Sequence, residues 1–148
     1  MPVGEREALT GLITMLIVVV LVTFRLFDQH ASGAFDGPDA LQVWARSILI
    51  LIGVSIAIAI AVSVLAHILE AVLTGERPDD RRDERDHLIE RRALSWAWYL
   101  LSFGILAVIV DLAFGSSAFR ALNLMLALCA GAELVKDGVK LILYRRGS

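Results

Sequence analysis

The sequence predicts an all-α membrane protein in which four transmembrane helices form two helical hairpins and both chain ends lie in the cytoplasm. Composition, four long apolar runs and the distribution of lysine and arginine support this fold. Of the 148 residues, 57% are hydrophobic, and the mean hydropathy is +0.71. A soluble domain contains roughly 45 to 50% apolar residues, so the excess apolar surface is expected to face lipid.

The four apolar runs are each about long enough to cross a hydrocarbon core of roughly 30 Å. We expect spans at about 9–27, 43–67, 94–114 and 119–144, within a single transmembrane domain that covers residues 1–148. Short polar segments rich in glycine and serine join the first run to the second and the third to the fourth. The predicted fold is therefore a four-helix transmembrane bundle.

The orientation follows from the basic residues, which lie mainly in a charged linker at residues 75–93 and near the C-terminus. They are Arg77, Arg81, Arg82, Arg85, Arg91, Arg92, Lys136, Lys140, Arg145 and Arg146. Cytoplasmic loops of membrane proteins carry an excess of lysine and arginine. The linker and both termini are thus predicted to be cytoplasmic, in a multi-pass protein of the bacterial inner membrane. Trp96, Trp98, Tyr99 and Tyr144 are expected to form an aromatic belt on that side.

The most distinctive segment of the linker, residues 83–93, reads D-E-R-D-H-L-I-E-R-R-A. Arg82 and Asp86 stand at i and i+4, a spacing that supports a helix, and this helix is predicted to continue into the third span. The segment resembles the D-E-R-D-x-x-I-E-x-[RK]-A segment that precedes a span in uncharacterised small multi-span membrane proteins of bacteria and archaea. The resemblance covers this segment and the general hairpin layout, about a fifth of the chain, and implies no known activity.

The same segment places Asp83, His87 and Glu90 at i, i+4 and i+7, a spacing that could bring two carboxylates and an imidazole to one metal ion. A segment this rich in charge produces such triplets by chance, and it lacks a metalloprotease H-E-x-x-H signature. We therefore interpret these residues as solvated charge, and we expect no metal and no cofactor.

Ionisable residues within the membrane zone are candidate functional residues because they are costly there. Near the outer boundary they are Arg25, Arg46, Asp111 and Arg120. Asp111 is predicted to pair with one of the three arginines, because pairing removes the penalty of an isolated charge. The favoured interpretation of this outer layer is a structural ion pair.

A second polar cluster is predicted at the cytoplasmic ends of the second and fourth spans. Its members are His67, Glu70, Glu133, Lys136 and Asp137, with Lys140 as a further counter-charge. Residues one helical turn apart share a face, so each span contributes a polar stripe. An ion-pair network is the favoured interpretation, and a proton or cation relay through His67, Glu70 and Glu133 is the alternative.

Small residues recur at helical spacing on the second and fourth spans. This helix-packing stripe consists of Gly53, Ala57, Ala61, Ala127 and Gly131. In lipid, small side chains let helices approach closely, and such contacts drive association. A stripe that faces out of the bundle would be a surface for a dimer or another membrane protein.

The sequence contains no P-loop, nucleophile elbow, C-x-x-C or zinc-protease motif, and its loops are too short for a catalytic domain. We therefore expect that this protein is not an enzyme. In the linker acids slightly outnumber bases, which argues against nucleic-acid binding. The expected function is that of an accessory, assembly or regulatory subunit that binds other helices, as a homo-oligomer or with another membrane protein. The alternative is a small proton- or cation-coupled transporter that works as a dimer.

Overall fold

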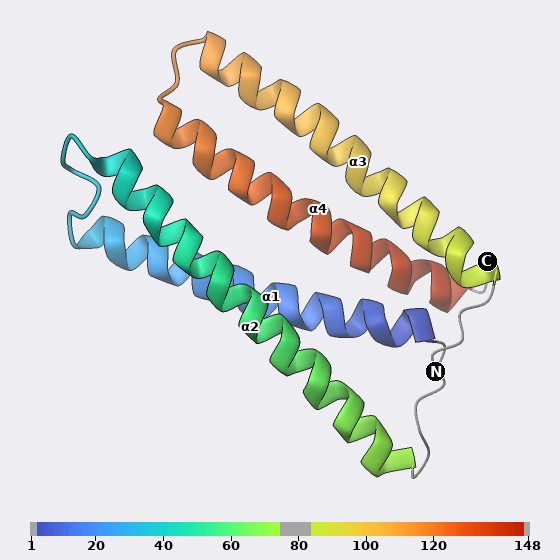
Figure 1. Ribbon diagram of the computed structural model, residues 1–148. Helices are drawn as coiled ribbons and strands as arrows, with labels where there is room; N and C mark the ends of the chain where they lie inside the picture. The colour runs from blue at the N-terminus through green and yellow to red at the C-terminus, as the bar shows by residue number, and fades with distance from the viewer. Residues whose placement is uncertain (1–2, 75–83, 147–148) are drawn as a thin grey trace. The chain divides into compact units, whose positions relative to one another are not determined.

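The computed structural model describes residues 3–74 and 84–146, which form four α-helices, and short turns join the first helix to the second and the third to the fourth (Figure 1). The helices are α1 (Val3–Ala31), α2 (Ala40–Thr74), α3 (Glu84–Ala113) and α4 (Ala118–Arg146). All four are long enough and apolar enough to cross a membrane. The described residues therefore have the fold of a multi-pass, all-α membrane protein.

Each helix is longer than the span predicted for it. The prediction placed the second span at 43–67, whereas α2 continues to Thr74. The third span was expected from residue 94, whereas α3 begins at Glu84, so the prediction that the charged segment continues as a helix into the third span is confirmed. The expectations for Arg77, Arg81, Arg82 and Asp83 lie outside the described residues.

Helix α3 ends in a Schellman motif, in which a residue with positive φ turns the chain out of the helix. The amide of Ser116 donates to the carbonyl of Asp111 at 3.3 Å, and that of Gly115 donates to Leu112 at 3.0 Å. Gly115 has a φ of 94°, a conformation that glycine adopts without the steric cost of a Cβ. Ser117 then caps α4, because its Oγ accepts from the amide of Arg120 at 3.2 Å.

Helix α1 ends in the same way. The amide of Ala34 donates to Gln29 at 3.0 Å, that of Gly33 donates to His30 at 3.1 Å, and Gly33 has a φ of 74°. The turn continues to Asp39, whose carbonyl accepts from the amide of Val43 in the first turn of α2 at 3.0 Å. Both short connections are thus fixed by the glycine that follows the helix.

The chain divides into two compact units, Met1–Met15 with Asp79–Ser148, and Leu16–Pro78. In the first unit α3 and α4 are antiparallel and pack against each other (Figure 1). The buried residues of this unit are mostly small: Ala8, Ala93, Ala97, Ala121 and Ala132. Small side chains allow the helix backbones to approach closely, so packing here depends on backbone proximity more than on large interlocking side chains.

The second unit contains the rest of α1 and helix α2. Trp44, Ile48 and Leu51 are buried on one face of α2. Gln29 of α1 donates its amide to the hydroxyl of Ser47 on α2 at 2.8 Å. An interhelical hydrogen bond of this kind is favourable in lipid, where few other partners are available.

Large apolar side chains cover the outside of the helices. Phe24 and Phe27 are each 74% exposed, Val72 is 76% exposed and Phe114 is 88% exposed. A soluble monomer rarely exposes contiguous apolar surface on this scale. Lipid is the solvent that suits such a surface.

Candidate functional site: a polar seam between α3 and α4

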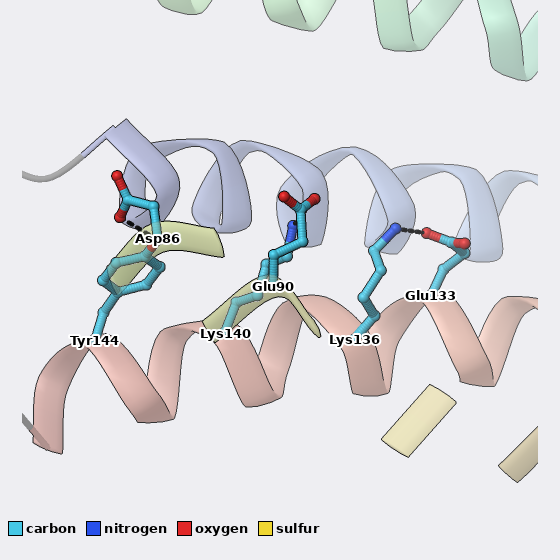
Figure 2. Close-up of polar contacts among 6 residues, drawn as sticks. All are labelled: Asp86, Glu90, Glu133, Lys136, Lys140 and Tyr144. Atoms are coloured by element: carbon cyan, nitrogen blue, oxygen red, sulfur yellow. Dashed lines mark hydrogen bonds and ion pairs between the residues drawn. The ribbon is translucent and has the colours of Figure 1, made fainter. Parts of the chain in front are cut away.

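A line of polar side chains runs along one face of α4 and meets two acids on α3 (Figure 2). On α4 these side chains recur every three or four residues, which places them on one face of the helix. We call the set the polar seam: Asp86, Glu90, Glu133, Lys136, Asp137, Lys140 and Tyr144. All of them belong to the first compact unit.

At one end of the seam the hydroxyl of Tyr144 donates to Oδ1 of Asp86 at 2.6 Å (Figure 2). Asp86 is buried, with 8% of its surface exposed. A buried carboxylate needs donors to offset its lost hydration. The hydroxyl of Tyr144 thus links the two helices, and its place in the aromatic belt stays a prediction.

One turn along the seam, Nζ of Lys140 lies 3.3 Å from Oε1 of Glu90, which makes an ion pair between α4 and α3. Lys140 is buried, with 9% of its surface exposed, whereas the Glu90 side chain retains 34% of its own. Lys136 and Glu133 form a second ion pair within α4, and its Glu133 side chain is 54% exposed. The first pair ties two helices together, and the second lies at the surface.

Asp137 lies between these pairs and is buried, with 7% of its surface exposed. Its carboxylate abuts Gly11 of α1, where a Cβ would come within 3.0 Å of Asp137 Cγ. Lys136 and Lys140 supply positive charge from the same helix. Among the described residues, however, no donor forms a hydrogen bond with the Asp137 carboxylate. This acid is held near neutralising charge without a direct partner.

The first turns of α1 approach α4 through a stripe of small residues, Gly4, Ala8 and Gly11. Ala8 is 1% exposed, and a Cβ at Gly4 would lie 2.7 Å from Cζ of Tyr144. The sequence analysis missed this contact. The spacing of these small residues at i, i+4 and i+7 was the available signal.

The predicted cytoplasmic cluster is distributed over both compact units. Glu133, Lys136 and Asp137 lie in the seam, whereas His67 and Glu70 belong to the unit that contains α2. Nδ1 of His67 lies 2.7 Å from the carbonyl oxygen of Ser63, which can only accept, so Nδ1 carries the proton. That the α2 residues contact those of α4 stays a prediction.

Asp86 and Glu90 were not recognised as candidate residues. Helical spacing lets Leu88, Ile89, Arg92 and Trp96 share one face, which could meet a neighbouring helix or the lipid headgroups, and of these four only Ile89 is buried. The face that meets α4 carries Asp86, Ile89 and Ala93 instead. The acids were interpreted as solvated because charge dominates the segment.

In the predicted outer layer Asp111 lies beside Arg120, with 3.3 Å between Oδ2 and Nε. Arg120 is one of the three partners considered for it. The geometry is not that of a hydrogen bond, and Oδ2 of Asp111 is buried without a donor among the described residues. Arg25 pairs with Asp28 at 3.2 Å, with both side chains exposed, and Arg46 is also exposed.

The predicted helix-packing stripe lies mostly on the outside of the described structure. Gly53, Ala57, Ala61 and Ala127 are exposed, and a Cβ at Gly53 would meet nothing within 4 Å. A Cβ at Gly131 would lie 3.8 Å from Leu100, an ordinary contact. These residues are therefore free to serve as a surface for another helix, which stays a prediction.

The described residues contain no group of three histidine, cysteine or acidic side chains arranged to hold a metal ion. Asp83, one member of the triplet considered above, lies outside them. His87 is exposed and Glu90 is paired with Lys140. Most of the polar side chains of the seam are engaged in ion pairs and hydrogen bonds.

No protein-family model, curated protein or solved structure matches this chain. The class that the fold defines is a small multi-pass membrane protein with four candidate spans. Its function has to be argued from its own residues.

Proposed function

We propose that this chain is a non-enzymatic integral protein of the bacterial inner membrane that works as an accessory, assembly or regulatory subunit by binding the helices of other membrane proteins. The observation that carries the proposal is the pairing within the seam. Asp86 bonds to Tyr144, and Glu90 pairs with Lys140, so these polar groups join α3 to α4. Their chemistry is used for holding helices together.

The proposal includes two helical hairpins with both termini in the cytoplasm. The excess of lysine and arginine in the linker and at the C-terminus supports this orientation. The exposed small residues of α2, Gly53, Ala57 and Ala61, suit a contact with a partner helix, either in a second copy or in another membrane protein.

Copurification tests this function. The tagged protein, produced at native level and extracted in mild detergent, should retain a second membrane protein or a second copy of itself. Gly53→Leu should release it, because the larger side chain holds the helices apart. Val54→Leu, at an exposed neighbouring position, is the matched control and should retain it. A protein that purifies as a lone monomer, or that keeps its partner in Gly53→Leu, would contradict the proposal.

The second candidate is a proton- or cation-coupled transporter that works as a dimer, and the specific observation in its favour is Asp137. A buried acid without a hydrogen-bond donor among the described residues is a typical proton carrier in membrane proteins. The pure protein in liposomes under an imposed pH gradient separates the two functions. We expect no flux. Flux that disappears in Asp137→Asn but persists in Asp36→Asn, a change in an exposed turn, would establish the transporter instead.

A further inference from the structure

Acidic and basic side chains separate on the paired ends of α3 and α4. The acids Asp86 and Glu90 of α3 have partners on α4, and Asp137 of α4 is buried against α1. The arginines, in contrast, lie on the exposed faces of these helix ends. All five that the structure describes at this end are exposed: Arg85, Arg91, Arg92, Arg145 and Arg146.

These arginines have no ion-pair partner among the described residues, although the segment as a whole is rich in acids. The pairs formed by Tyr144 with Asp86 and by Lys140 with Glu90 bring the start of α3 beside the end of α4 (Figure 2). The outer surface of these two helix ends carries the five arginines and one exposed acid, Glu84. Its charge is therefore strongly positive, in contrast to the nearly balanced charge of the whole chain.

Exposed aromatic side chains follow the arginines along α3. Trp98 is 67% exposed and Tyr99 is 61% exposed. They lie seven residues after Arg91 and Arg92 respectively, so each aromatic shares a face with one arginine, about 10 Å farther along the helix. Tryptophan and tyrosine sit at headgroup level in membrane proteins. The arginines then lie at the depth of the phosphates or just beyond it.

We infer that the exposed arginines at the start of α3 and the end of α4 form a binding surface for the headgroups of anionic phospholipids. A planar guanidinium donates to two phosphate oxygens at once, which suits this contact. Basic residues beside a span are attracted to anionic lipid, and each one strengthens the contact roughly fivefold. The inference rests on the proposed membrane embedding.

Tryptophan fluorescence tests the surface directly, because the chain has three tryptophans and two of them, Trp96 and Trp98, lie next to the arginines. Trp44→Phe removes the third. The full chain with this change would be reconstituted in bilayers of phosphatidylcholine and phosphatidylglycerol, with bromine atoms on the acyl chains of one lipid or the other. Brominated lipids quench tryptophans that they touch. Quenching by either brominated lipid reports the embedding, and the ratio between the two reports the preference for anionic lipid.

We expect brominated phosphatidylglycerol to quench at least threefold more per molecule than brominated phosphatidylcholine. Arg91→Gln with Arg92→Gln should bring the ratio close to one, whereas Arg91→Lys with Arg92→Lys should keep most of it. Arg25→Gln with Arg46→Gln, which removes two exposed arginines of the other compact unit, is the matched control and should leave it unchanged. If the α3 variant does not fold, the double variant Arg145→Gln with Arg146→Gln on α4 tests the same surface.

Equal quenching by the two lipids in the unaltered chain would overturn the inference while leaving the membrane embedding intact. A preference that survives the removal of both pairs of arginines would overturn it as well. If neither brominated lipid quenches, the proposed membrane embedding itself fails. An arginine-dependent association with an acidic protein, without a preference for anionic lipid, would assign the surface to that partner and refute the lipid site.

Discussion

Lys140 shows at the scale of one residue how the seam accommodates charge. It is almost fully buried, and its ammonium group faces Glu90 of the neighbouring helix rather than water. A buried charge without a partner is strongly destabilising, whereas a paired one is tolerated. The pair therefore explains why a lysine occurs at this position of α4.

Lys140→Met should lower the free energy of unfolding by about 2 kcal/mol, because it removes the ion pair between α4 and Glu90 of α3 while the Glu90 side chain stays partly hydrated. Thermal unfolding in detergent, followed by circular dichroism, measures the loss. Lys136→Met removes a more exposed pair and should cost less than about 1 kcal/mol. Adding Glu90→Gln to Lys140→Met should recover part of the lost stability. If Lys140→Met and Lys136→Met lower the stability equally, burial of the Lys140 pair is unimportant.

Part of this seam could be predicted from the sequence. Glu133, Lys136 and Asp137 were grouped correctly on one face of α4, because residues three or four apart in a helix are neighbours. Asp86 and Glu90, which bind Tyr144 and Lys140, could not be selected, because a segment with so many charges offers several helical faces of similar character. The choice depends on how α3 is rotated against α4, which local spacing does not determine.

At the scale of elements, the ends of α1 and α3 are fixed by the same backbone device. Gly33 and Gly115 both have positive φ and both follow a helix whose last carbonyls they help to satisfy. The sequence analysis predicted turns at both places from their glycine and serine content. The structure adds that both turns begin with the same type of helix cap.

Gly115→Ala should destabilise the protein by about 1 kcal/mol, because an L side chain in the left-handed region is strained. Gly37→Ala is the matched control, since Gly37 has no positive φ and a Cβ there would meet nothing within 4 Å. Chemical denaturation in detergent compares the two variants. Equal stabilities would show that the Gly115 turn relaxes without cost.

Gly104 of α3 lies directly against the side chain of Leu128 on α4. A Cβ at Gly104 would lie 2.9 Å from Leu128 Cδ1 and 3.1 Å from its Cγ. Gly104→Val should therefore separate the helices and cost about 2 kcal/mol of unfolding free energy, as overpacking commonly does.

Gly53→Val makes the same change in helix α2, at a site where a Cβ would meet nothing within 4 Å. Because glycine is replaced by the same residue within a helix in both variants, differences in helix propensity cancel. Unfolding in detergent should separate them by most of the predicted 2 kcal/mol. A Gly53→Val protein that is the less stable of the two would refute the assigned α3–α4 packing.

At the scale of the whole molecule, the sequence predicted the number of spans well. Composition and run length were sufficient, because four runs of this length and apolarity have few alternatives to membrane spans. The helices are longer than the spans, since α2 and α3 continue past the apolar runs into more polar segments, as the sequence predicted for α3. Charged residues end a membrane span but not a helix, which explains the difference.

Orientation and embedding together form the central claim, and cysteine labelling in intact cells tests them most directly. Cys129→Ser removes the only native thiol, and single cysteines then replace Asp36, Ser116, His87 or Arg146. We predict that a membrane-impermeant thiol reagent labels the cysteines at positions 36 and 116 from outside, and reaches those at 87 and 146 only after the cells are opened. Labelling of 87 and 146 in intact cells, with 36 and 116 protected, or equal labelling of all four before lysis, would contradict a four-span protein with cytoplasmic ends.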